Sequence, residues 1–153
     1  MAASVVRKWL APLVGVLVMV GGLGAALAWT ERLPDGPVEV LWDREACAHC
    51  RMHVGEPSFA AQLQLADGRV LHFDDPGCLL RYEAERPLDV HAAWFHHSRE
   101  ARWLPRERTG FVPASPTPMG YGLGAVEVGT PGVMPLAEVL AKLHGRHGEE
   151  GRR

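Results

Sequence analysis

The sequence predicts an α+β domain with small antiparallel sheets, preceded by one N-terminal transmembrane or signal helix. Three observations predict this class: an uncharged apolar run over residues 9–29, two alternating segments joined by Asp67-Gly68, and a helix start at Pro76. Strand, strand, helix and strand patterns follow one another, and a looser strand–helix series comes after them. This order fits two ββαβ-like units, although no sequence repeat marks them.

Residues 1–30 are expected to be a membrane anchor or a signal sequence. Arg7 and Lys8 precede a run of about twenty apolar residues, which is long enough to cross a bilayer as a helix. The positive-inside rule then places the rest of the chain in the periplasm or at the cell exterior. The length of the run favours an uncleaved inner-membrane anchor, whereas Ala26-Leu27-Ala28 has the small-x-small form that signal peptidase cuts. No cysteine ends the run, so lipoprotein anchoring is excluded.

Composition narrows the class of partner. The 153 residues suit one domain, and 16 basic against 18 acidic residues give no basic stripe that would indicate a nucleic-acid partner. Three cysteines are an odd number for a protein outside the cytoplasm, so at least one thiol stays free unless it pairs with a partner. These thiols are therefore better candidates for metal ligands than for disulfide partners.

The chain after the apolar run divides into three parts. Residues 31–37 hold two prolines and a glycine and read as a linker. Residues 38–144 form the domain, which opens with a short strand over residues 38–42. Residues 145–153 are polar and are predicted to be a disordered tail.

A β-hairpin is the clearest element of the domain. Residues 59–65 alternate in polarity, Asp67-Gly68 is a strong hairpin turn, and residues 69–73 form the second strand. Asp74 or Asp75 then caps a helix that has Pro76 in its first turn and ends before Pro87.

The later elements are predicted from shorter patterns. Strands are expected over residues 89–95, near residues 109–112 and over residues 121–128. An amphipathic helix is expected over residues 135–144, because its leucines and Val139 recur on one face.

A metal-binding pattern lies between the first strand and the hairpin. Residues 47–53 contain two thiols, one thioether and two imidazoles. Soft sulfur ligands select Cu(I), and a thioether discriminates against zinc. The pattern therefore predicts a Cu(I) site with Cys47, Cys50, Met52 and His53 as metal ligands, while the role of His49 stays open.

Other interpretations of the pattern stay open. Cys47 and Cys50 can form a structural or thioredoxin-like disulfide, or one of them can be an ordinary core residue. A zinc site is possible if Cys78 and His72 complete four ligands. Covalent c-type haem is excluded, because Arg51 stands where that motif needs a histidine.

Two further sulfur residues are candidates. Cys78 falls in the predicted helix, where we expect a buried structural thiol rather than a ligand. Met119 lies in the extended segment Pro118-Met119-Gly120, where a thioether has little packing use, and it is a candidate ligand.

Four short motifs in order resemble the NosL family, the accessory proteins of nitrous-oxide reductase that act as copper chaperones. They cover most of residues 40–128: Cys47-Ala48-His49-Cys50-Arg51-Met52, Ala60-Ala61-Gln62, Phe73-Asp74-Asp75-Pro76-Gly77-Cys78 and Thr117-Pro118-Met119-Gly120-Tyr121-Gly122. Cys50 and Met52 match the family's Cys-Gly-Met core, and Met119 matches the methionine of its Thr-Pro-Met-Gly loop.

The resemblance implies a fold similar to the organomercurial lyase accessory domain and one bound Cu(I). It implies a carrier rather than an enzyme, delivering copper to nitrous-oxide reductase or a related recipient, with a membrane transporter of the same maturation system as a further partner. Two features depart from the family. Arg51 stands where members usually have glycine, and the apolar run lacks a lipid-bearing cysteine. The alternative function is a periplasmic thiol–disulfide oxidoreductase that uses Cys47 and Cys50.

Overall fold

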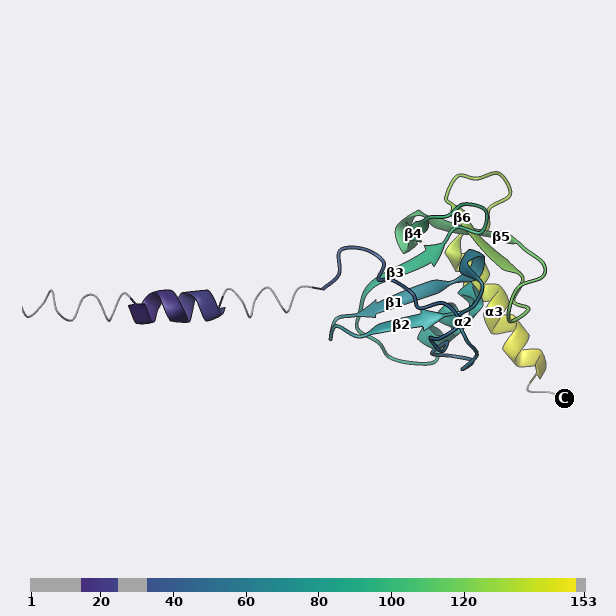
Figure 1. The fold of residues 1–153 in the computed structure, drawn as a ribbon. Coiled ribbons are helices and arrows are strands. Elements are labelled where there is room, and N and C mark those ends of the chain that lie inside the picture. The colour runs from purple at the N-terminus through teal and green to yellow at the C-terminus, as the bar shows by residue number, and fades with distance from the viewer. Residues whose placement is uncertain (1–14, 25–32, 151–153) are drawn as a thin grey trace, which may run out of the picture. The chain divides into compact units, whose positions relative to one another are not determined.

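The structure is a computed structural model of the chain, and it describes residues 15–24 and 33–150. The chain divides into two units, Met1–Leu33 and Pro34–Arg153. In the first unit, residues 15–24 form a helix (Figure 1). The residues of this helix are exposed. Among the described residues, no helix is both long and apolar enough to span a membrane. The anchor or signal sequence predicted for residues 1–30 falls largely outside the described residues and stays a prediction.

The second unit is an α+β fold with small antiparallel sheets, as the sequence predicts. Its elements are the 3₁₀ helix η1 (Pro57–Phe59), β1 (Ala61–Leu65), β2 (Val70–Phe73), α2 (Pro76–Ala84), β3 (Val90–His96), β4 (Trp103–Pro105), the 3₁₀ helix η2 (Arg106–Arg108), β5 (Thr109–Pro113), β6 (Leu123–Glu127) and α3 (Leu136–Glu150). Four strands form one sheet in the order β2-β1-β3-β4, and β5 pairs with β6 in a second sheet. In chain order β1-β2-α2-β3 is a ββαβ unit, and β5-β6-α3 repeats its first three elements.

The β1–β2 hairpin confirms the strongest element prediction. Ala61 pairs with Phe73 across the two strands, and the turn holds Gly68 at a φ of +87°, a conformation that glycine adopts without strain. Alternation along the strands turns Leu63 and Phe73 toward one face, where both are fully buried. The hairpin thus supplies the apolar face of the larger sheet.

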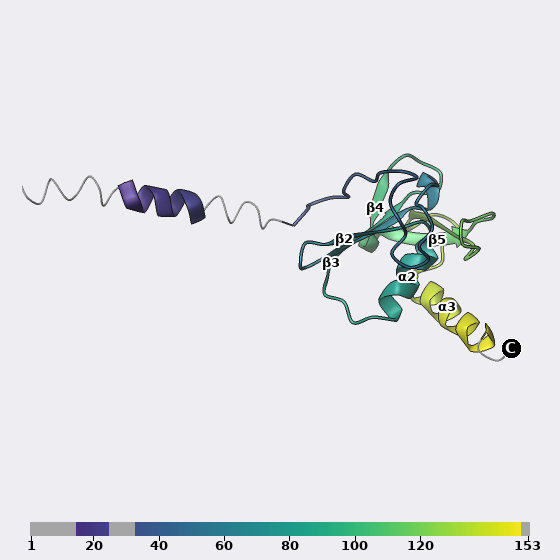
Figure 2. The same ribbon diagram turned by 60° about the horizontal axis from the view of Figure 1, so that its bottom comes forward.

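Helix α2 begins where the sequence predicts and lies on that apolar face. The side chain of Asp75 caps the helix by accepting from the backbone N–H of Gly77, and Pro76 occupies the first turn. The ring of Tyr82 meets Phe73 edge-on at 5.4 Å between centroids. Figure 2 shows the larger sheet nearly edge-on, with α2 and α3 on the same side of it.

The opposite face of β1 carries two buried glutamines that fasten the preceding segment. The side-chain amide of Gln62 donates to the carbonyl of Val38 at 2.9 Å and accepts from its N–H at 2.8 Å. Gln64 donates to the carbonyl of Gly36 at 2.6 Å. Because these side chains take its hydrogen bonds, the segment is extended but is not the strand predicted over residues 38–42.

Two other elements differ from the sequence prediction. Strand β4 has no predicted counterpart, since three residues ending in Pro105 are too short to show a period. Helix α3 does not end at His144 but continues to Glu150, into the segment where the sequence predicts a disordered tail.

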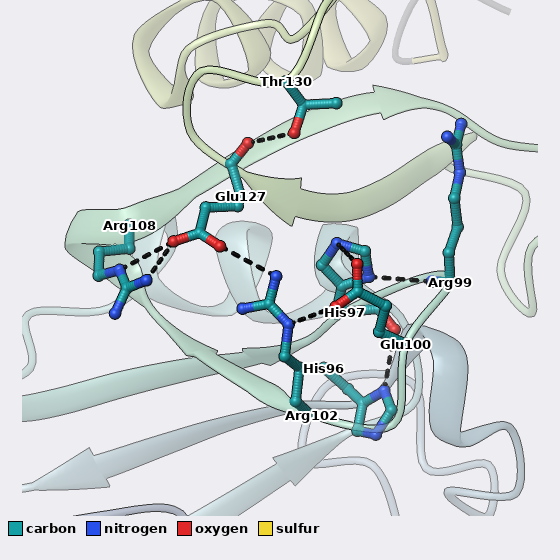
Figure 3. Close-up of polar contacts among 8 residues, drawn as sticks. All are labelled: His96, His97, Arg99, Glu100, Arg102, Arg108, Glu127 and Thr130. Atoms are coloured by element: carbon teal, nitrogen blue, oxygen red, sulfur yellow. Dashed lines mark hydrogen bonds and ion pairs between the residues drawn. The ribbon is translucent and has the colours of Figure 1, made fainter.

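A charged cluster joins β6 to the start of β4 (Figure 3). Glu127 at the end of β6 accepts from Arg102 at 2.9 Å and also binds Arg108 of η2. Arg102 in turn donates to Glu100 at 2.6 Å. In the core, the rings of Phe95 in β3 and Phe111 in β5 meet edge-on at 5.2 Å between centroids and connect the two sheets. The two sheets therefore behave as one body.

Glu127→Gln is expected to lower stability at neutral pH and to have less effect in acid. Arg108 and Arg102 hold the pKa of Glu127 below its ordinary value of 4.5. A lowered folded-state pKa stabilises the fold above the ordinary value, and this contribution is lost as pH falls through the folded-state pKa. Thermal unfolding measured from about pH 7 to about pH 3 tests this, with the exposed Glu107→Gln as the control for lost surface charge. A gap between the two variants that does not narrow in acid would contradict it.

Candidate metal centre

The loop that carries Cys47 and Cys50 is closed by backbone hydrogen bonds. Cys47 donates to the carbonyl of Met52 at 2.8 Å, and Arg51 donates to the carbonyl of Cys47 at 3.0 Å. Ala48 donates to the carbonyl of His72 at 2.9 Å, which attaches the loop to the edge strand β2. The loop therefore has a defined place beside the sheet.

Arg51 occupies a conformation that normally belongs to glycine. Its φ is +69°, in the left-handed region where a Cβ crowds the backbone of an L-residue. The tight return from Cys50 to Met52 requires this conformation, so an arginine at this position has a backbone cost. Its side chain is exposed, which leaves the positive charge in solvent.

Cys78 reaches the same loop from α2. It lies in the first turn of the helix, immediately after the capped Gly77. The three cysteine sulfurs, of Cys47, Cys50 and Cys78, all lie within 4.8 Å of one another, and none forms a disulfide. Cys47 and Cys78 are fully buried, whereas Cys50 is partly exposed. The structure thus brings together two thiols that the sequence predicts as ligands and one that it predicts as structural.

The three thiols have different affinities for protons. A hydrogen bond from the Cys78 thiol, aided by backbone N–H groups of Cys50, Asp74 and His49, lowers the pKa of Cys47 to about 5 against the opposing effect of burial. The same hydrogen bond, together with burial, raises the pKa of Cys78. Burial also raises the pKa of Cys50. The group therefore stabilises negative charge on Cys47 and keeps protons on Cys50 and Cys78. A thiophilic cation can take the place of these protons.

The two methionines predicted as ligands belong to different loops. Met52 follows Cys50 in the same loop, and its side chain is 53% exposed. Met119 belongs to the loop between β5 and β6 and is partly buried against the core. Its backbone N–H donates to Oδ2 of Asp75 at 3.2 Å, which places the loop at the start of α2.

The histidines near the loop have other contacts. His53, the fifth predicted ligand, is exposed and lines a groove of about 420 Å³ with Glu56 and Asp74. Nε2 of His72 lies 2.7 Å from a carboxylate oxygen of Glu45, and Nδ1 of His49 lies 3.9 Å from one of Glu85. Among the side chains that the structure describes, no histidine, aspartate or glutamate joins the three sulfurs at their spacing.

Sequence analysis missed the place of Cys78, although its neighbours carry a signal. A Cβ at Gly77 would lie 2.2 Å from the ring of Tyr121, so only glycine lets this ring pack on the first turn of α2. A capped helix start with Pro76 and an obligatory glycine points to a turn that other segments approach closely. Cys78 stands at that turn.

Comparison of the chain with protein-family models, with curated proteins and with solved structures finds no match.

Arg51→Gly is expected to be more stable than Arg51→Ala. Both variants remove the same charge, but only glycine relieves the left-handed conformation, which costs an L-residue about 1–2 kcal/mol. Subtracting the extra chain entropy of glycine leaves a difference of about 0.5–1 kcal/mol in the free energy of unfolding. Denaturant unfolding of the two variants measures this difference. Equal stability would mean that the loop does not hold residue 51 in this conformation.

Proposed function

We propose that this chain is a Cu(I) carrier whose cargo is held by Cys47, Cys50 and Cys78, with Met52 and Met119 as further sulfur ligands. The observation that carries the proposal is the meeting of three unbonded thiols within 4.8 Å. The three sulfurs come from two segments far apart in the sequence, and a group of close soft sulfurs favours a soft cation.

The number and type of ligands favour Cu(I) over zinc. A structural zinc site needs four ligands in a closed tetrahedron. His72, the sequence candidate for a fourth ligand, is engaged with Glu45 and Gln62 instead. Cu(I) needs only two or three soft sulfurs at a time, which the three thiols supply, and the two methionines offer thioethers as exchangeable ligands that zinc binds weakly.

Unequal exposure of the thiols gives a route for release. Cys47 and Cys78 are fully buried, while Cys50 and the thioether of Met52 reach solvent. An incoming ligand from a recipient protein can replace these outer sulfurs first, and the inner thiols release the ion once the recipient holds it. Transfer is then a series of ligand exchanges that never leaves the ion free.

The NosL resemblance supplies the proposed biological setting. The domain would be tethered to the inner membrane by residues 1–30 and face the periplasm, with nitrous-oxide reductase or a related copper enzyme as recipient. A membrane transporter of that maturation system is the proposed second partner. The order β1-β2-α2-β3 followed by β5-β6-α3 is consistent with the paired ββαβ-like units that the resemblance implies.

A thiol–disulfide oxidoreductase is the second candidate. The sulfurs of Cys47 and Cys50 are unbonded and within 4.8 Å, so a small movement can join them. An external disulfide, however, meets only Cys50 directly, because Cys47 is fully buried. This function requires neither methionine, which separates it from the carrier.

Titration of the full chain with Cu(I), reduced and without oxygen against a chromophoric chelator, tests the carrier. One equivalent is expected to bind. Affinity should fall at least about 10-fold in Cys50→Ser and less in Met52→Ala, because each removes one soft ligand and loss of even an outer-shell partner of a ligand costs about 10–100-fold. Met134→Leu is the matched control, because this thioether lies at β5 and beside α3. Equal copper binding by the wild type and the three variants, together with a readily reduced Cys47–Cys50 disulfide in the wild type, would contradict the carrier and favour the oxidoreductase.

A further inference from the structure

The carboxylate of Asp75 connects two segments that both contribute to the proposed copper site. Asp75 is fully buried, and its two oxygens accept from different parts of the chain. Oδ1 accepts from Gly77 N–H at 2.8 Å and so caps the helix that carries Cys78. Oδ2 accepts from Met119 N–H at 3.2 Å. One side chain therefore fixes a thiol-bearing helix and a thioether-bearing loop to each other.

The loop around Met119 is organised about this carboxylate. The hydroxyl of Thr117 also hydrogen-bonds Asp75, and its oxygen accepts from Gly122 N–H at 3.1 Å. Gly120 donates to the carbonyl of Thr117 at 3.1 Å, which closes the turn. The turn is thus compact in itself, and Asp75 supplies hydrogen bonds that hold it at α2.

The preceding residue has a similar role on the other side of the site. Asp74 is also buried, and its Oδ1 accepts from Gly55 N–H at 3.2 Å, beside the loop of Cys47 and Cys50. Adjacent aspartates therefore hold opposite loops, and Asp74 is a natural control for Asp75: the same side chain, similarly buried, without the contact to Met119.

We propose that Asp75 is a positioning residue that sets the thioether of Met119 at the copper site and thereby raises affinity for Cu(I). This inference rests on the proposed function, with Met119 as a ligand. Asp75 does not touch the ion but acts through the backbone of Met119. A carboxylate suits this role because it offers an acceptor on each side, whereas an amide offers only one.

Asp75→Asn separates the two contacts. Its carbonyl can still cap Gly77, while its NH₂ group faces the N–H of Met119 and cannot accept from it. We expect Asp75→Asn to lower Cu(I) affinity about tenfold, to the level of Met119→Leu, and to cause no further loss when combined with Met119→Leu. Asp74→Asn should change Cu(I) affinity by the same factor in the wild type and in the Met119→Leu variant. Chelator competition on the wild type, the three single variants and the two double variants of the full chain measures the coupling.

A milder variant keeps the test possible if Asp75→Asn does not fold. Thr117→Val leaves the helix cap intact and removes one donor to Asp75 together with the acceptor of Gly122 N–H, so its loss of affinity should also vanish in the Met119→Leu background. Equal losses in both backgrounds would assign Asp75 a general structural role and overturn the inference. If Met119→Leu binds as the wild type does while Cys50→Ser loses copper, the inference fails and the carrier stands.

Discussion

Cys78 can meet the Cys47–Met52 loop only because the chain turns at Asp74-Asp75 and begins a helix there. Strand β2 ends at Phe73, the capped turn follows at once, and the third thiol falls in the first turn of α2. The loop is attached to β2 by the hydrogen bond from Ala48 to His72. The loop of Cys47 and the helix of Cys78 are therefore both attached at the end of β2. The hydrogen bond between Cys78 and Cys47 depends on that geometry.

The sulfur-containing residues differ in how deeply they are buried. Cys47 and Cys78 lie in the core, where a hydrogen bond between the two sulfurs replaces the hydrogen bonds to water that exposed thiols make. Cys50 and Met52 remain at the surface on a loop whose return forces Arg51 into the left-handed region. A backbone cost at this position is tolerable only if the tight turn is needed, and holding two thiols near a third is such a need.

Local patterns in the sequence predicted the parts of the fold that local interactions determine. Asp67-Gly68 forces a hairpin, and Pro76 after an aspartate cap starts α2, so both were foreseeable. The segment at Val38 was predicted as a strand because its alternation is β-like, but its partner is the side chain of Gln62. Such a side-chain partner lies 24 residues away and leaves no periodic signal.

The candidate site follows the same division. Cys47, Cys50 and Met52 are predicted from their spacing within one loop. Met119 is predicted from its extended segment and from the resemblance, whereas Cys78 joins the group through tertiary structure. A buried cysteine in a helix is usually a core residue, and only the register of α2 against the loop makes it part of a group. Because Cys78 is the residue that sequence could not assign, it gives the sharpest test of the centre.

The measurement that tests the centre most directly is X-ray absorption at the copper edge, on the one-to-one Cu(I) complex of the wild type and of Cys78→Ser. The three-thiol site predicts a shell made of sulfur in the wild type, with one sulfur fewer in the variant. A shell that Cys78→Ser leaves unchanged, or one dominated by nitrogen and oxygen, would contradict a copper site built on these three cysteines.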